Sequence, residues 1–222
     1  MFMGVIMNEK LQKYLDEKVM PKNDLNDEGH NAFHVNYVRR RSMKFAIMIG
    51  NVNLDMVDTI AVYHDVGHSI DSKNHEKISA KILYEDENLR EFFDEDEIIV
   101  MMEAIEDHRA SDGTIPRSIY GKIVSSADRN TSVNELLKRT YAYRLKHMPD
   151  AELDLIIEDS KKHAINKFGV NGYAISKMYF FDDEYENFLR EIQELVSDNE
   201  EFKRRFIKVN NIDIIKSRIK ES

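Results

Sequence analysis

Ala61-Val62-Tyr63-His64-Asp65-Val66-Gly67-His68 is the stretch of this chain from which its fold and its chemistry are best inferred. It places an adjacent histidine and aspartate at the end of an apolar segment that begins at Leu54. Neighbours on a helix point about 100° apart, but they can still converge on one ion, particularly where the helix ends. Gly67 favours a helix end directly after the pair. We therefore expect a buried helix that delivers His64 and Asp65 to the bottom of a cleft.

The surrounding sequence is rich in other metal-binding side chains. Asp128 follows a segment between residues 30 and 108 that holds six of the eight histidines. These are His30, His34, His64, His68, His75 and His108. Imidazoles and carboxylates together form a ligand set that first-row divalent metals prefer. The chain has no cysteine, which excludes a disulfide framework and a thiolate zinc cage.

Composition limits the class of protein. The 222 residues carry a net charge of −9, which argues against a protein that coats a nucleic-acid polymer. A small phosphorylated substrate is compatible with this charge, because a bound ion supplies positive charge locally. No apolar stretch approaches the ~18 residues that span a bilayer, and Met1 to Met7 lacks the features of a signal peptide. We expect a cytoplasmic protein with no membrane partner, whose first residues are disordered or loosely docked.

The pattern of apolar residues predicts an all-α fold. Only eight glycines and three prolines occur, too few for the many tight turns of a sandwich or barrel. Asn53 and Asn74 are expected helix caps, and Asp94 with Glu97 has capping-box spacing. Helical periodicity predicts helices over residues 8–20, 32–49, 54–65, 75–83, 94–108, 118–128, 135–147, 151–168, 183–196 and 200–220.

The character of the sequence changes after residue 130, where amphipathic helices continue without a dense His/Asp cluster. We therefore expect an N-terminal helix within residues 1–22, a metal-binding helical core within residues 23–145 and a helical C-terminal extension over residues 146–222. The aromatic run between Phe168 and Phe181 is interpreted as core packing, with a pocket wall or an oligomer contact as the alternative.

Three segments resemble the HD superfamily of metal-dependent phosphohydrolases: Phe33-His34-Val35-Asn36-Tyr37-Val38, residues 61–67, and Ala127-Asp128-Arg129. The resemblance covers roughly Asn26 to Tyr143. It implies a helical bundle that holds a divalent ion with His34, His64, Asp65 and Asp128.

Two further segments are similar to the dinuclear branch of that superfamily. His75-Glu76-Lys77-Ile78-Ser79-Ala80 and Ile105-Glu106-Asp107-His108, followed by Asp112-Gly113, resemble ligand-bearing segments of HD-GYP phosphodiesterases. The resemblance implies His75 and His108 as ligands of a second ion. Asp107 replaces a histidine of that pattern, His68 stands where a lysine is common, and the Gly-Tyr-Pro signature is absent. Specificity for cyclic dinucleotides is therefore not implied.

The ligand types predict one or two ions of Fe, Mn, Co, Ni or Zn. Such ions lower the pKa of bound water toward ~7 and so provide hydroxide, and Asp65, with two oxygens, is the natural bridge between them. Arg109, Arg117 and Lys122 are candidates for holding the substrate phosphate. The group that protonates the leaving oxygen is left open among His30, His68 and Asp107.

The leading hypothesis is a phosphohydrolase that cleaves a phosphomonoester or phosphodiester in a small, nucleotide-like substrate, with homo-oligomers possible. The alternative is a non-catalytic module of the same fold that binds a nucleotide. The spacing of His64 and His68 also matches the His-Glu-x-x-His motif of zinc proteases. Aspartate replaces the required glutamate, however, and Gly67 weakens the helix between the histidines.

Overall fold

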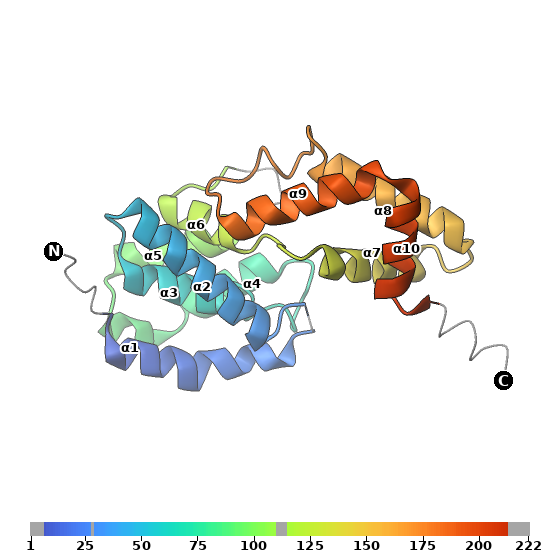
Figure 1. Cartoon of the computed structure of the whole chain (residues 1–222). Coiled ribbons are helices and arrows are strands. Elements are labelled where there is room, and N and C mark those ends of the chain that lie inside the picture. The colour runs from blue at the N-terminus through green and yellow to red at the C-terminus, as the bar shows by residue number, and fades with distance from the viewer. Residues whose placement is uncertain (1–6, 28, 110–114, 213–222) are drawn as a thin grey trace. The chain divides into compact units, whose positions relative to one another are not determined.

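The structure, a computed structural model, describes residues 7–27, 29–109 and 115–212 (Figure 1). Every regular element within these ranges is a helix, which confirms the predicted all-α class. The chain divides into two compact units, residues 1–128 and residues 129–222. Three predicted features lie outside the described residues: the start of the chain over residues 1–6, the segment Asp112-Gly113, and residues 213–220 of the last helix.

The first unit begins with a continuous helical segment made of α1 (Glu9–Tyr14), the π-helical turn η1 (Leu15–Val19) and the 3₁₀ helix η2 (Met20–Leu25). Pro21 does not stop the chain's helical path as expected. It stands in the first turn of η2, where its missing N–H costs no hydrogen bond. Tyr14 anchors this segment, because its hydroxyl donates to Asp86 Oδ2 at 2.5 Å, beside the hydroxyl of Tyr63 at 2.6 Å.

The core of the first unit is built around a central helix, α3 (Leu54–Tyr63), in which every residue from Met56 to Tyr63 is buried. This helix packs against α2 (Ala32–Ile49), α4 (His75–Tyr84), α5 (Glu95–Glu106) and α6 (Ile119–Ala127) (Figure 1). A short 3₁₀ helix, η3 (Glu87–Glu91), precedes α5. The predicted burial of the segment before His64 is confirmed.

Side-chain caps explain where several of these helices begin. The Asn53 side chain accepts from Asp55 N and Met56 N, and Asp94 with Glu97 forms the expected capping box. Asn74 occupies the N-cap position of α4, but its side chain makes no capping hydrogen bond and donates instead to Asp71 Oδ2 at 2.8 Å.

A tight turn follows α3 and carries the His-Asp pair. His64 is the C-cap residue of α3, and the backbone N–H groups of Val66 and His68 donate back to Tyr63 O and Asp65 O. Gly67 N donates to Ser79 Oγ at 2.9 Å, so the turn lies directly against α4. A Cβ at Gly67 would stand 2.8 Å from the backbone nitrogen of Ser79, closer than real Cβ contacts allow.

The second unit contains α7 (Val133–His147), α8 (Leu153–Phe168), α9 (Asp183–Ser197) and α10 (Asn199–Val209). The observed division differs from the predicted boundary after residue 145, because α7 packs against α8, α9 and α10. Likewise, residues 1–22 are not a separate piece, since η1 packs on α3 and η2 on α2. Phe168 is buried against Phe188, while Tyr173 and Phe181 are exposed.

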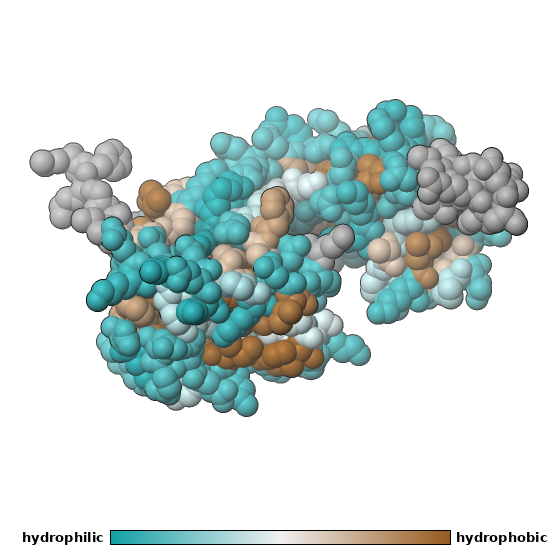
Figure 2. Space-filling view, turned by 90° about the horizontal axis from the view of Figure 1, so that it is seen from below, coloured by the Kyte–Doolittle hydropathy of each residue, from teal (hydrophilic) through white to brown (hydrophobic). Residues whose placement is uncertain are grey.

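Hydrophilic residues dominate the face shown in Figure 2, and apolar residues gather there in a few separate patches. Among the described residues, no helix combines the length and the apolar composition that a membrane crossing requires.

We predict that Gly67→Ala destabilises the protein by about 1–3 kcal/mol, because the new methyl group would overlap Ile78 and the backbone of Ser79. Urea unfolding of the metal-free protein, followed by circular dichroism, measures the loss. Ser69→Ala, at an exposed position of the same turn, is the matched control. An unchanged midpoint for Gly67→Ala would show that α4 does not confine the turn.

Candidate metal centre

The ends of five helices meet in the first unit and bring six metal-binding side chains together. His34 lies in the first turn of α2, which Asn31 caps by accepting from Phe33 N and His34 N. The other five side chains also lie at helix ends: His64 and Asp65 after α3, His75 at the start of α4, His108 after α5 and Asp128 at the end of α6.

One group of ligand atoms surrounds Asp65 Oδ2, which lies 3.5 Å from His34 Nε2 and 3.3 Å from His64 Nε2. The two imidazole nitrogens are 3.4 Å apart. Asp128 completes this group, with its Oδ1 atom 3.0 Å from His34 Nε2. These are the four residues that the HD resemblance implied for the first ion.

A second group faces the other carboxylate oxygen. Asp65 Oδ1 lies 3.4 Å from His75 Nε2 and 3.8 Å from His108 Nε2, and those two nitrogens are 3.2 Å apart. Each oxygen of Asp65 therefore faces its own pair of imidazoles. The two groups therefore share the carboxylate of Asp65, and each has the make-up of a candidate metal site.

Backbone carbonyls fix the orientation of three of the imidazoles. Nδ1 of His64 donates to Ala61 O at 2.7 Å, and Nδ1 of His108 donates to Ile105 O at 2.6 Å. Nδ1 of His75 is 3.1 Å from Ser72 O. Because a carbonyl only accepts, Nδ1 carries a proton in each ring, and the neutral form of each ring directs its Nε2 lone pair to the centre. Outer contacts of this kind orient metal-binding histidines in general.

The donor set fits first-row divalent ions. Bonds of about 2.0–2.2 Å to nitrogen and oxygen place neighbouring ligands of one ion roughly 3.0–3.5 Å apart, close to the separations observed in both groups. Asp65 Oδ1 is buried, and it accepts no hydrogen bond from any described residue. An unsatisfied buried carboxylate oxygen is costly, and a cation between it and His75 would remove that cost.

Protonation states also suit metal binding. Burial alone would raise the pKa of Asp65, but the charge and the hydrogen bond of His64 hold it well below its usual range. Burial likewise lowers the pKa of His64, but Asp65 and Asp128 outweigh this effect and raise it to about 9. Burial and the charge of His64 lower the pKa of His108 to about 4. His108 is therefore ready to bind, whereas His64 must first release a proton.

Two more histidines lie beside the second group. The rings of His30 and His68 stack with centroids 3.7 Å apart and planes 16° apart, and the His68 centroid is 5.3 Å from that of His75. His30 Nδ1 is 2.6 Å from Asp27 Oδ1. Sequence reasoning missed Asp27, for which the only signal was its position in the polar segment before His30. The two histidines that the sequence marked as proton donors thus lie next to the centre.

The other predicted site residues are held mostly by ion pairs. Arg117 donates through its backbone N to Asp107 Oδ2 at 2.7 Å, and its guanidinium contacts Glu103 and Glu106. Arg109 donates to Glu76 Oε2 at 3.2 Å, which links it to the residue after His75. Lys122 is half-buried in α6. Their roles with substrate, and that of Asp107, remain predictions.

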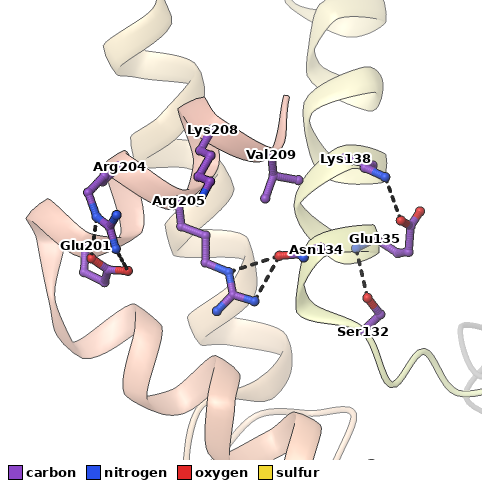
Figure 3. A pocket seen from close by; sticks show the side chains of 9 residues that line it. All are labelled: Ser132, Asn134, Glu135, Lys138, Glu201, Arg204, Arg205, Lys208 and Val209. Carbon is purple, nitrogen blue, oxygen red and sulfur yellow. Dashed lines mark hydrogen bonds and ion pairs between the residues drawn. The ribbon is translucent and has the colours of Figure 1, made fainter. Parts of the chain in front are cut away.

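A groove in the second unit offers a different surface. Several of its cations are paired, as the dashed lines in Figure 3 show: Arg204 with Glu201 and Lys138 with Glu135. Arg205 donates to Asn134 Oδ1 at 3.0 Å. The lining residues are Ser132, Asn134, Glu135, Lys138, Glu201, Arg204, Arg205, Lys208 and Val209. Within the described part of this unit, no group of side chains has the arrangement of a metal site.

The family model of the HD domain matches residues 33–131 of the chain. No curated protein and no solved structure matches the chain. The matched segment begins one residue before His34 and ends just after Asp128, so it includes all the side chains of the two ligand groups around Asp65. The resemblance to the HD-GYP branch finds no further support in these comparisons. The resemblance of this segment to the HD superfamily is therefore confirmed, and residues 33–131 are an HD domain.

Proposed function

We propose that this protein is a metal-dependent phosphohydrolase that uses two divalent transition ions to hydrolyse a phosphate ester. The observation that carries the proposal is the position of Asp65, whose two oxygens face separate pairs of imidazoles. HD domains are typically hydrolases that bind divalent metals, which supports the same reaction class.

The first ion would be held by His34, His64, Asp65 and Asp128, and the second by Asp65, His75 and His108. Such ions supply a hydroxide nucleophile at neutral pH and neutralise charge on the phosphoryl oxygens. The protein's part is to hold the ligands in place: carbonyls orient three imidazoles, and packing against α4 fixes the turn that carries Asp65.

We assign protonation of the leaving oxygen to the stacked pair His30 and His68. They lie beside His75, and Asp27 orients His30 through Nδ1. Asp107 fits this role less well, because Arg117 already donates to both of its carboxylate oxygens.

We propose a small, nucleotide-like phosphate ester as the substrate, in the cytoplasm. The net charge of −9 disfavours a nucleic-acid polymer and leaves positive charge to the metal centre. Phe33, directly before His34, is 84% exposed and offers a ring on which a base can stack.

We predict that protein purified without oxygen or chelators holds two transition ions per chain. His75→Ala and His108→Ala should each retain one ion, because the group around Asp65 Oδ2 stays intact. Elemental analysis of the purified protein measures the stoichiometry, with His147→Ala, at an exposed position in α7, as the control. One ion in the unchanged protein would reduce the centre to its first group, and none after reconstitution would favour the non-catalytic module.

We predict that Asp65→Ala lowers turnover of p-nitrophenyl phosphate and bis-p-nitrophenyl phosphate by at least about 10²-fold while the helical content is kept. Asp96→Ala, an exposed aspartate of α5, should leave turnover unchanged. Activity should disappear on chelation and return with added metal. Thermal stabilisation by nucleotides with no turnover of either ester would instead identify a binding module.

We predict that metal binding strengthens as the pH rises toward 9. The raised pKa of His64 means that this ring is protonated at neutral pH in the metal-free protein, and the ion must displace that proton. Affinity should rise up to about tenfold per pH unit below pH 9. Calorimetry in buffers of different ionisation enthalpy should detect more protons released per ion at pH 7.5 than at pH 10, because His64 is already neutral at the higher pH. Equal proton release at both values would contradict this assignment.

A further inference from the structure

Arg41 is a fully buried cation that contacts backbone carbonyls and aromatic rings. Its exposed fraction is 0%, and its Nη1 donates to Ala127 O at 2.7 Å and, more weakly, to Ser126 O at 3.4 Å. The rings of Tyr37 and Phe45 lie 5.5 and 5.4 Å from its guanidinium carbon, within cation–π range. A buried charge is expensive unless it is well hydrogen-bonded, so these contacts determine where the guanidinium can lie.

The two carbonyls that Arg41 contacts are the last ones of α6. Carbonyls at a helix end carry partial negative charge, so a cation is favourable there. Ser126 O also accepts from the backbone N of Asp128. The next residue is Asp128, the C-cap of α6, whose carboxylate reaches His34 Nε2 at 3.0 Å. Arg41 therefore fixes the backbone directly before a predicted metal ligand.

Helix α2 positions both His34 and Asp128, the two residues of that contact. Arg41 lies about two turns after His34 in α2, so the two side chains share a face of the helix. That face presents His34 to the centre directly, and it holds Asp128 in place through the end of α6. The neighbouring arginines differ from Arg41, because Arg39 pairs with Asp58, and Arg40 is exposed and lies over the ring of Tyr37 at 5.5 Å. Arg40 therefore serves as a control for the contact with this ring.

We propose that Arg41 is a positioning residue for the ion held by His34, His64, Asp65 and Asp128, and that it does not serve the ion at His75 and His108. The inference rests on the metal centre of the proposed function but not on its hydrolytic activity. It assigns to Arg41 a selective effect on one of two ions that share Asp65.

The test compares the affinity of each ion in Arg41→Met and Arg40→Met. His108→Ala isolates the first ion, and in that background Arg41→Met should weaken Mn²⁺ or Zn²⁺ binding by about 10–100-fold. Asp128→Ala disables the first group. In that background, Arg41→Met should change the affinity of the ion at His75 and His108 by less than about twofold. Arg40→Met should change neither affinity.

A merely structural role would lower the stability and weaken both ions together. Unfolding of the metal-free variants is therefore measured alongside binding, and Arg41→Lys, which keeps the charge but loses the planar fork, provides an intermediate variant that carries the test if Arg41→Met fails to fold. Equal weakening of both ions, or an unchanged first ion, would overturn the inference. Two bound ions without turnover would refute the proposed function and leave this inference standing, whereas a first group that takes up no ion would overturn both.

Discussion

The shared carboxylate of Asp65 is the constraint on which the rest of the site depends. Its oxygens lie 3.3 Å from His64 Nε2 on one side and 3.4 Å from His75 Nε2 on the other, so a small rotation would break both sets of contacts. The turn that carries Asp65 is held by the hydrogen bond from Gly67 to Ser79, and α4, which contains Ser79, also supplies His75. Packing of α4 thereby determines both the position of the Asp65 carboxylate and that of His75, which faces its Oδ1 atom.

Much of this could be predicted from the sequence, because it depends on local patterns. The buried apolar segment before His64, the caps at Asn53 and Asp94, and the all-α class all follow from residue spacing and appear in the structure. The six side chains of the centre came from family resemblance, which supplied their grouping. Local patterns do not reveal which oxygen of Asp65 faces which imidazole, and this pairing is seen only in the structure.

Other features depend on contacts between distant segments and left no local signal. Pro21 was expected to end a helix, but the chain continues as a 3₁₀ helix because proline is tolerated in a first turn. Arg41 stood within a run of three arginines, and nothing in that run marked it as the buried one. Its partners, the carbonyls of Ser126 and Ala127, belong to a helix far along the chain. The grouping of α7 with the second unit likewise depends on its packing against α8, α9 and α10.

Because its ligands come from the ends of five helices between residues 34 and 128, the centre exists only when the whole first unit has assembled. A chain that lacks any one of these helices would retain too few ligands for the two proposed ions, so metal would bind the complete core in preference to partly folded forms. The cell's supply of transition metal would then set the lifetime of the folded protein, through its resistance to proteases, as well as the occupancy of the site.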